Sequence, residues 1–282
     1  MNEILIKAPA KINLYLDILG KRPDGYHDLK MIMQTVSLYD EISLKKIDTT
    51  IELSSDAPMP TGEKNTAYKA AKLMIDTFGI KSGVKIEIKK KIPMGAGLAG
   101  GSTDAAGVIK GMNEMFELGQ NQEELAKLGK KVGADVPFCV IGGTAIAEGI
   151  GEQITVLDKF NDVDIVMVKP DFSASTAYIF GKYCGDDLRE KPGIEKLIES
   201  MRNRDIKEVG KYLYNALETV TAIEYDEIDK IKSKLLELGA QGPLMSGSGS
   251  TVYGLFQCRQ EAEFAVEELS QKYKQLFLVK TI

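Results

Sequence analysis

A glycine-rich segment at residues 93–103, P-M-G-A-G-L-A-G-G-S-T, constrains this chain more than any other feature. Within it, residues 95–100 match the pattern G-x-G-x-x-G. Apolar and charged residues alternate over 84–89, which predicts a strand before the segment, and a helical stretch through about residue 116 follows it. Glycines let a backbone approach a ligand closely, and N–H groups at a helix start attract anions. The segment therefore predicts a phosphate-binding loop.

Other well-known loops differ from this one at specific positions. A Walker A loop needs a lysine where Gly101 stands, so that motif is excluded. A dinucleotide-binding unit needs a strand buried on both faces and an acidic residue about 20 residues on, whereas Glu114 and Glu117 fall in or just past a helix. A tight turn without a ligand is disfavoured, because four glycines stand within eleven residues before an exposed helix start. The residues favour a kinase loop of another type.

Length and charge set the broad class. Dividing 282 residues by roughly 150 residues per domain gives about 1.9, so we expect two domains. The boundary is expected near 158–162, which divides the chain into 1–160 and 161–282. A net charge of −5 argues against a nucleic-acid-binding protein, which normally carries a basic stripe.

Cysteine and histidine are scarce, and this excludes several kinds of site. The three cysteines, Cys139, Cys184 and Cys258, lie far apart in the sequence and build neither a disulfide framework nor a C-x-x-C motif. His27 is the single histidine, so a zinc site is disfavoured, and we assign no metal ligand. A Ser–His–Asp hydrolase of the G-x-S-x-G type is excluded, because its histidine would have to follow the other two residues.

No membrane or export segment is expected. Residues 1–7 contain an acid and a base and no long apolar run, unlike a signal peptide. Residues 238–258 lack charge, but eleven of them are Gly, Ser, Thr or Gln and Pro243 lies inside, which indicates a glycine-rich loop. We expect a cytoplasmic protein.

Periodicity and turn residues predict a mixed α and β chain. Strict alternation over 11–19 predicts a half-buried strand, and an antiparallel β region follows it. Asn65 is a candidate N-cap for a helix that Gly79 ends, and Asn121 with Glu124 resembles a capping box for a helix that Gly133 closes. The remaining expected elements are strands at 31–36, 41–47, 143–148, 164–168, 251–256 and 276–281, three or four helices between 175 and 238, a loop at 242–250, and a helix from about 261.

Two glycine-rich segments resemble motifs of the GHMP-superfamily small-molecule kinases. Residues 93–103 are similar to that family's ATP-binding motif, roughly P-x-x-x-G-L-x-x-S/G-S, and residues 244–256 to its C-terminal glycine-rich motif. The resemblance covers nearly the whole length. It implies an α+β, two-domain fold: an N-terminal ribosomal-protein-like α/β domain and a C-terminal ferredoxin-like domain, with the active site between them. It also implies a transferase that uses ATP and Mg²⁺.

Three further segments narrow the resemblance within that superfamily. Residues 8–14 (A-P-A-K-I-N-L), 22–27 (R-P-D-G-Y-H) and 133–138 (G-A-D-V-P-F) are similar to kinases whose substrate is a cytidyl-diphosphate polyol of non-mevalonate isoprenoid biosynthesis. The resemblance implies phosphorylation of the 2-hydroxyl of that small molecule. The chain departs from some relatives by having Ala96 and Ala99 where they have glycine, and we expect the phosphates to be accommodated still.

The resemblance also assigns roles to two charged residues. Asp135 is the candidate base, because an ordinary aspartate is ionised at pH 7 and accepts a proton from a hydroxyl. Spacing alone equally allows it to be the N-cap of the segment that begins at Val136. The resemblance places Lys11 beside Asp135 and the attacking hydroxyl, where its charge favours the ionised base. Without the resemblance, Lys11 would read as a solvated strand lysine.

Binding residues follow from the same motifs. Ser102 or Thr103 would supply a hydroxyl near the metal or phosphates, or only cap the helix. Tyr26 and His27 offer flat rings for a cytosine, although turn packing explains them equally well from sequence alone, and either Tyr178 or Phe180 would add an aromatic ring. The nucleotide-binding set is Pro93, Met94, Gly95, Ala96, Gly97, Leu98, Ala99, Gly100, Gly101, Ser102 and Thr103, and the substrate-binding set is Asn13, Tyr26, His27, Gly247 and Ser248.

Two other functions stay open at this point. One is a different kinase of the superfamily, of homoserine or mevalonate type, which would have no need of Tyr26 and His27. The other is a nucleotide-binding module without turnover, although both Lys11 and Asp135 are present. Oligomeric state, binding order and the ligands of Mg²⁺ do not follow from the sequence.

Overall fold

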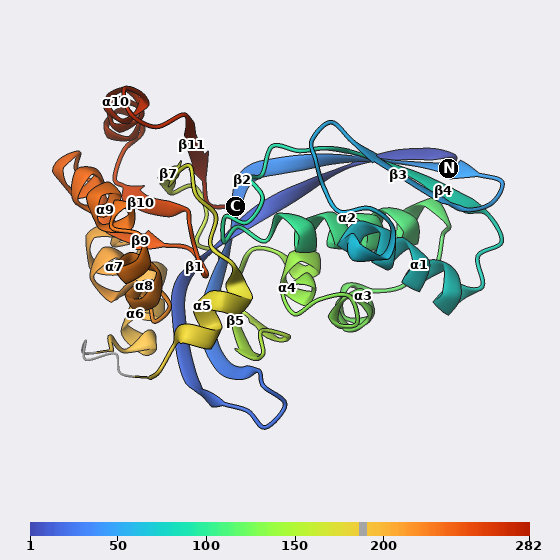
Figure 1. Cartoon of the computed structure of the whole chain (residues 1–282), viewed down its shortest axis with the longest axis horizontal. Helices are drawn as coiled ribbons and strands as arrows, with labels where there is room; N and C mark the ends of the chain where they lie inside the picture. The colour runs from blue at the N-terminus through green and yellow to red at the C-terminus, as the bar shows by residue number, and fades with distance from the viewer. Residues whose placement is uncertain (186–190) are drawn as a thin grey trace.

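The computed structural model describes residues 1–185 and 191–282. Within these ranges, two β-sheets with helices packed against them make up the chain (Figure 1). The first sheet has seven strands, with the path β3-β4-β2-β1-β8 and with β5 and β6 branching from β2. Its strands are β1 (Glu3–Lys21), β2 (His27–Ile47), β3 (Ile51–Ser55), β4 (Gly83–Lys89), β5 (Thr144–Gly149), β6 (Gln153–Val156) and β8 (Tyr214–Asn215).

Strands β1 and β2 form one long antiparallel hairpin that runs between the two halves of the molecule (Figure 1). β2 pairs with β4 over residues 41–47 and with β5 over residues 29–34. The separate strands expected at 31–36 and 41–47 are therefore one continuous strand. The pairing of β1 with β2 shifts register between Pro9 and Lys11 and again between Asn13 and Tyr15, so Lys11 and Asn13 lie in an irregular part of the hairpin.

One face of the first sheet is covered by helices (Figure 1). The longest of them, α2, packs on β2 through small residues. A Cβ built on Gly107 would lie 2.6 Å from Ile42 Cδ1, and one built on Gly111 would lie 2.5 Å from Leu44 Cδ1, so these glycines permit the close approach. The elements of this layer are η1 (Gly62–Lys64), α1 (Thr66–Phe78), α2 (Gly100–Met115), α3 (Gln122–Lys130) and α4 (Val136–Ile141).

The second sheet has four antiparallel strands in the order β11-β7-β10-β9. With helices α9 and α10 packed against it, it forms the expected ferredoxin-like half (Figure 1). Its strands are β7 (Asp164–Lys169), β9 (Gln241–Met245), β10 (Val252–Phe256) and β11 (Gln275–Lys280), and the helices of this half are α5 (Thr176–Lys182), α6 (Ile194–Arg202), α7 (Ile206–Tyr212), α8 (Glu218–Glu224), α9 (Glu227–Glu237) and α10 (Arg259–Ser270).

Capping residues in the sequence predicted where helices begin and end, but the sequence pattern did not predict how many helices there are. Asn65 caps α1, Gly79 ends it in the left-handed conformation, and Asn121 with Glu124 forms a complete capping box on α3. The expectation of three or four helices between 175 and 238 is wrong, since the described part of that region holds five, α5 to α9. Most of them have seven to nine residues, too few for a clear 3.6-residue period, which is why the pattern merges them.

The expected domain boundary near residue 160 falls between β6 and β7, and it stays a prediction. β8, which follows it in the sequence, pairs in parallel with β1 at Tyr15 and Leu16, so the second half adds an edge strand to the first sheet. Of the helices in residues 1–185 and 191–282, none is both long and apolar enough to cross a bilayer. The cytoplasmic location stays a prediction.

Substitution of Leu44 and of Leu5 tests which face of the long hairpin packs in the core and so contributes to the free energy of unfolding. Leu44 is fully buried on β2 against α2, whereas Leu5 on β1 is 65% exposed. We expect Leu44→Ala to lower the free energy of unfolding by about 2–5 kcal/mol. We expect the matched variant Leu5→Ala to change it by about 0.5 kcal/mol or less. Urea unfolding followed by circular dichroism measures both, and equal losses would contradict the assigned face.

Candidate active site

A cavity of about 1050 Å³ is lined by residues from both halves of the chain. It brings together the glycine-rich loop, β1, the turn between β1 and β2, α5 and the loop after β9. Every residue of the predicted nucleotide- and substrate-binding sets lines it except Thr103, and so do Lys11 and Asp135. Residues up to 237 positions apart in the sequence therefore meet at one site.

The glycine-rich loop ends at α2 without a side-chain cap. Ala99 occupies the N-cap position in the left-handed conformation, with φ 57°, and contributes no side-chain hydrogen bond. Gly100, Gly101 and Ser102 form the first turn of α2 and line the cavity. N–H groups at a helix start have no partner within the helix, and the helix dipole adds positive potential there. This end of the cavity is therefore suited to an anion such as a phosphate chain.

Lys11 and Asp135 meet in the cavity, although one lies on β1 and the other precedes α4. Lys11 Nζ lies 3.7 Å from Asp135 Oδ2 and donates a hydrogen bond of 2.7 Å to Asn13 Oδ1. Lys11 is buried, whereas the Asp135 side chain is one-third exposed. Asp135 occupies the N-cap position of α4, but its side chain makes no capping hydrogen bond. The capping role that the spacing allowed is therefore not what its carboxylate does.

The two hydroxyls at the start of α2 have different surroundings. The hydroxyl of Thr103 donates a hydrogen bond of 2.6 Å to the carbonyl of Pro9, and Thr103 is buried outside the cavity lining. Its side chain is turned toward β1 and away from the cavity, which does not favour its predicted place in the nucleotide-binding set. Ser102 lines the cavity, and its hydroxyl bonds to no other residue in the described ranges.

Aromatic rings also line the cavity. His27 on β2 and Phe180 on α5 have ring centroids 5.4 Å apart and planes tilted by 35°. Tyr178 lies outside the lining and donates a hydrogen bond to Glu224 Oε1 at 3.0 Å. Phe180 is therefore the ring that accompanies His27. Burial first, and the nearby Lys21 charge second, lower the pKa of His27, which favours a neutral ring.

Comparison with known proteins identifies the family. The chain matches the model for the GHMP kinases N terminal domain over residues 65–143 and that for the GHMP kinases C terminal over residues 197–275. A 4-diphosphocytidyl-2-C-methyl-D-erythritol kinase from Acetivibrio thermocellus is 47% identical over 100% of both chains. One of the same name from Clostridium beijerinckii is 49% identical over 98% of this chain and 99% of its own. The chain belongs to the 4-diphosphocytidyl-2-C-methyl-D-erythritol kinases of the GHMP family.

Solved structures agree with this assignment and confirm the fold class. A crystal structure of 4-(cytidine 5'-diphospho)-2C-methyl-D-erythritol kinase has a TM-score of 0.85 and 30% identity, with 99% of each chain covered. A homoserine kinase from Cytophaga hutchinsonii has a TM-score of 0.80 at 18% identity, covering 100% of this chain and 95% of its own. That second likeness concerns the fold alone. The family membership and kinase activity that the sequence motifs predicted are confirmed.

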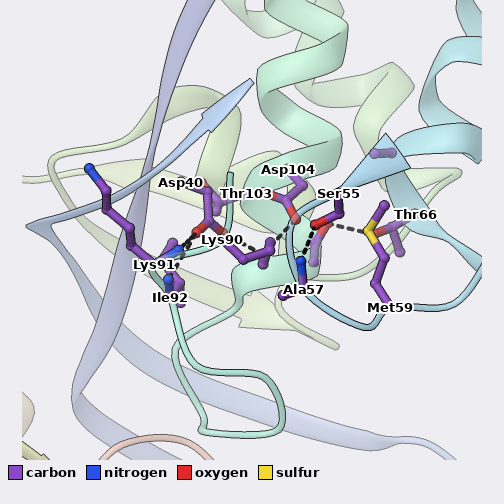
Figure 2. A network of polar contacts seen from close by, with 12 residues as sticks. Asp40, Ser55, Ala57, Met59, Thr66, Lys90, Lys91, Ile92, Thr103 and Asp104 are labelled. Atoms are coloured by element: carbon purple, nitrogen blue, oxygen red, sulfur yellow. Dashed lines mark hydrogen bonds and ion pairs between the residues drawn. The ribbon is translucent and has the colours of Figure 1, made fainter. Parts of the chain in front are cut away.

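A buried charged cluster in this GHMP kinase went unnoticed in the sequence (Figure 2). The Lys90 ammonium lies between the carboxylates of Asp40 and Asp104, with 2.7 Å to Asp104 Oδ2, and all three side chains are less than a tenth exposed. Burial, opposed by the Lys90 charge and aided by the Asp40 charge, raises the pKa of Asp104 to about 7. Burial disfavours the Lys90 ammonium, yet the two carboxylates together raise its pKa. The one sequence feature that pointed to this cluster is the run of three lysines at 89–91, and such a run usually lies on a solvated surface.

The cluster connects both ends of the glycine-rich loop. Asp40 Oδ1 accepts hydrogen bonds from the backbone N–H groups of Lys91, at 2.6 Å, and Ile92, at 2.9 Å, where the loop begins. Lys90 also binds Asp104 in the first turns of α2, where the loop has ended. Asp40, Lys90 and Asp104 thereby hold the entrance and exit of the loop together (Figure 2).

Removing the lysine isolates two buried carboxylates. We expect Lys90→Met to lower the free energy of unfolding by about 3–5 kcal/mol at pH 8, because breaking a buried ion pair leaves uncompensated charge. The loss should be smaller at pH 5, where Asp104, with its raised pKa, is protonated. Denaturant unfolding at the two pH values measures the difference.

The neighbouring Lys91 provides a control. It pairs with Glu41 at 2.8 Å on the surface, with its own side chain 59% exposed. Lys91→Met should change stability by less than about 1 kcal/mol and without this dependence on pH. Similar losses for the two variants would contradict the role given to the buried cluster.

Proposed function

We propose that this GHMP kinase transfers the γ-phosphoryl group of ATP to the 2-hydroxyl of 4-diphosphocytidyl-2-C-methyl-D-erythritol. The observation that carries the proposal is the cavity itself. Its lining combines the glycine-rich loop that suits an anion, the Lys11–Asp135 pair, and the His27–Phe180 rings. The curated relatives that align over the full chain carry the name of this activity.

The chemistry divides between the Lys11–Asp135 pair and the glycine-rich loop. The Asp135 carboxylate accepts the proton of the 2-hydroxyl while that oxygen forms a bond to the γ-phosphorus and the bond to the β-phosphate oxygen breaks, releasing ADP. The Lys11 ammonium, held by Asn13, lies 3.7 Å from the Asp135 carboxylate and stabilises negative charge on the attacking oxygen. Because the transition state is loose, positioning by the loop contributes more than proton removal by Asp135.

The loop and a magnesium ion share the task of charge neutralisation. No lysine stands within residues 93–103, so backbone N–H groups of the loop and of α2 must bind the phosphates. Mg²⁺ prefers oxygen ligands and usually keeps several waters beside substrate phosphates. The Ser102 hydroxyl, which faces the cavity, fits this preference and would hold the ion together with the phosphates. Bound Mg²⁺ supplies positive charge to the transferring group.

The aromatic end of the cavity distinguishes the proposed substrate from those of other GHMP kinases. His27 and Phe180 offer two rings at a spacing that suits contact with a flat base, and Tyr26 adds an exposed ring in the adjoining turn. Homoserine and mevalonate carry no ring for such a surface. Asn13, Gly247 and Ser248, which line the same cavity, would contact the polyol and its diphosphate.

A coupled assay of ADP production tests the substrate. We expect ATP-dependent turnover with 4-diphosphocytidyl-2-C-methyl-D-erythritol and none above background with homoserine or mevalonate. CDP should inhibit competitively against the cytidyl substrate, because it occupies the same aromatic end. Turnover with homoserine or mevalonate, or the absence of competition by CDP, would contradict the proposed substrate.

Substitutions in the charged pair test the mechanism. We expect Lys11→Ala and Asp135→Asn each to lower kcat by about 10²–10⁴, the usual contribution of a positioned acid or base. Lys7→Ala, on the exposed end of the same strand, and Asp76→Asn, on the surface of α1, are controls that should retain the parent rate. Calorimetric titration with ADP checks that the variants still bind nucleotide. Parent-like ADP release by Asp135→Asn would favour a different base.

A further inference from the structure

Three successive carbonyl groups of the glycine-rich loop accept hydrogen bonds from outside the loop. The Ala96 carbonyl accepts from the Thr251 N–H at 3.2 Å, and the Leu98 carbonyl from the Lys11 N–H at 3.2 Å. Between them, the Gly97 carbonyl accepts from the Ser246 hydroxyl at 3.0 Å. The loop is thus held by β1 on one side and by the loop after β9 on the other.

Fixing these carbonyls determines where the loop's N–H groups point. In a trans peptide the carbonyl of one residue and the N–H of the next point in opposite directions. With the carbonyls of Ala96, Gly97 and Leu98 bound outward, the N–H groups of residues 97–99 are directed away from those donors. These N–H groups make no hydrogen bond with other residues in the described ranges. They are therefore left for a ligand, and no carbonyl of these three can turn toward a phosphate and repel it.

Ser246 is the one side chain among the three donors, and its hydroxyl also contacts β1. Its Oγ accepts a hydrogen bond from the Asn13 N–H at 3.3 Å while donating to Gly97. Ser246 is fully buried and lies outside the cavity lining, so it acts through the groups it binds. One hydroxyl thereby joins the loop to the strand segment that carries Lys11 and Asn13.

The backbone around Ser246 is held firmly in place. Asn215 Nδ2 donates to the carbonyls of Met245, at 2.7 Å, and Gly247, at 2.8 Å. Glu218 Oε2 accepts from the Met245 N–H at 2.8 Å. A Cβ built on Gly97, whose φ is +76°, would lie 2.0 Å from the Ser246 carbonyl oxygen, so the two loops meet backbone to backbone. Such packing restricts the hydroxyl to its two partners.

We propose that Ser246 is a positioning residue for phosphoryl transfer: its hydroxyl orients the peptide between Gly97 and Leu98 for phosphate binding and sets its place relative to Lys11. This inference rests on the proposed function for the assignment of the loop to ATP. It does not depend on which alcohol accepts the phosphoryl group. Removal of the hydroxyl frees the Gly97 carbonyl, which can then rotate toward the cavity.

The test compares Ser246→Ala with Ser250→Ala. Ser250 is also fully buried in the same loop, but its hydroxyl donates to the Phe172 carbonyl at 2.7 Å, outside the glycine-rich loop. We expect Ser246→Ala to weaken ADP binding, measured by calorimetry, and to raise the KM for ATP about 5- to 100-fold, the range for a buried acceptor left unpaired. Ser250→Ala should change both by less than about 2-fold, while thermal melting shows similar losses of stability for the two variants.

Two results would overturn the proposal: ADP affinity like that of the parent protein in both variants, or an equal loss of ADP affinity in both. If Ser246→Ala does not fold, Ser246→Cys keeps a side chain at the same place with only a weak donor and should weaken ADP binding in the same direction. ADP binding also separates this inference from the proposed substrate. A parent protein that binds ADP but does not phosphorylate the cytidyl substrate contradicts the substrate alone, whereas one that binds no ADP overturns both.

Discussion

The close backbone approach between two glycine-rich segments is the contact on which the rest of the site depends. Gly97 and Ser246 meet with no room for a side chain between them, and β1, whose pairing with β2 shifts register three times, lies against both. This contact directs carbonyls outward and leaves N–H groups for an anion. It also places Lys11 and Asp135, which belong to elements far apart in the chain, beside the same cavity.

Charge is arranged around that loop and not within it. Walker-type loops carry a lysine that reaches the phosphates, whereas the lysines that line this cavity belong to β1, to η1 and to the chain entering the loop. Lys11 faces the cavity beside Asp135, and Lys90 lies in the cavity wall between Asp40 and Asp104. The first pair lies where the proposed phosphoryl transfer takes place, and the second cluster holds the loop ends together. The two lysines therefore have separate tasks at the same loop.

Predictions from the sequence succeeded where the signal is local. The caps at Asn65 and Asn121 and the strand before the loop follow from neighbouring residues, and the structure has all of them. The motifs at both glycine-rich segments identified the family. The short helices after residue 175 and the hydrogen bond from the Thr103 hydroxyl to the Pro9 carbonyl were missed, because both depend on what packs against them.

The sequence by itself determined the kinase family and predicted the phosphate loop and the pair Lys11 and Asp135, because each rests on residue types at short spacing or on a family motif. Only the tertiary structure decided that Phe180 and not Tyr178 faces His27, that Lys90 joins the two loop ends, and that Ser246 binds Gly97. Those facts depend on which buried donors and acceptors become neighbours when distant segments pack. A buried polar group must find a partner, and the fold alone determines which one is within reach.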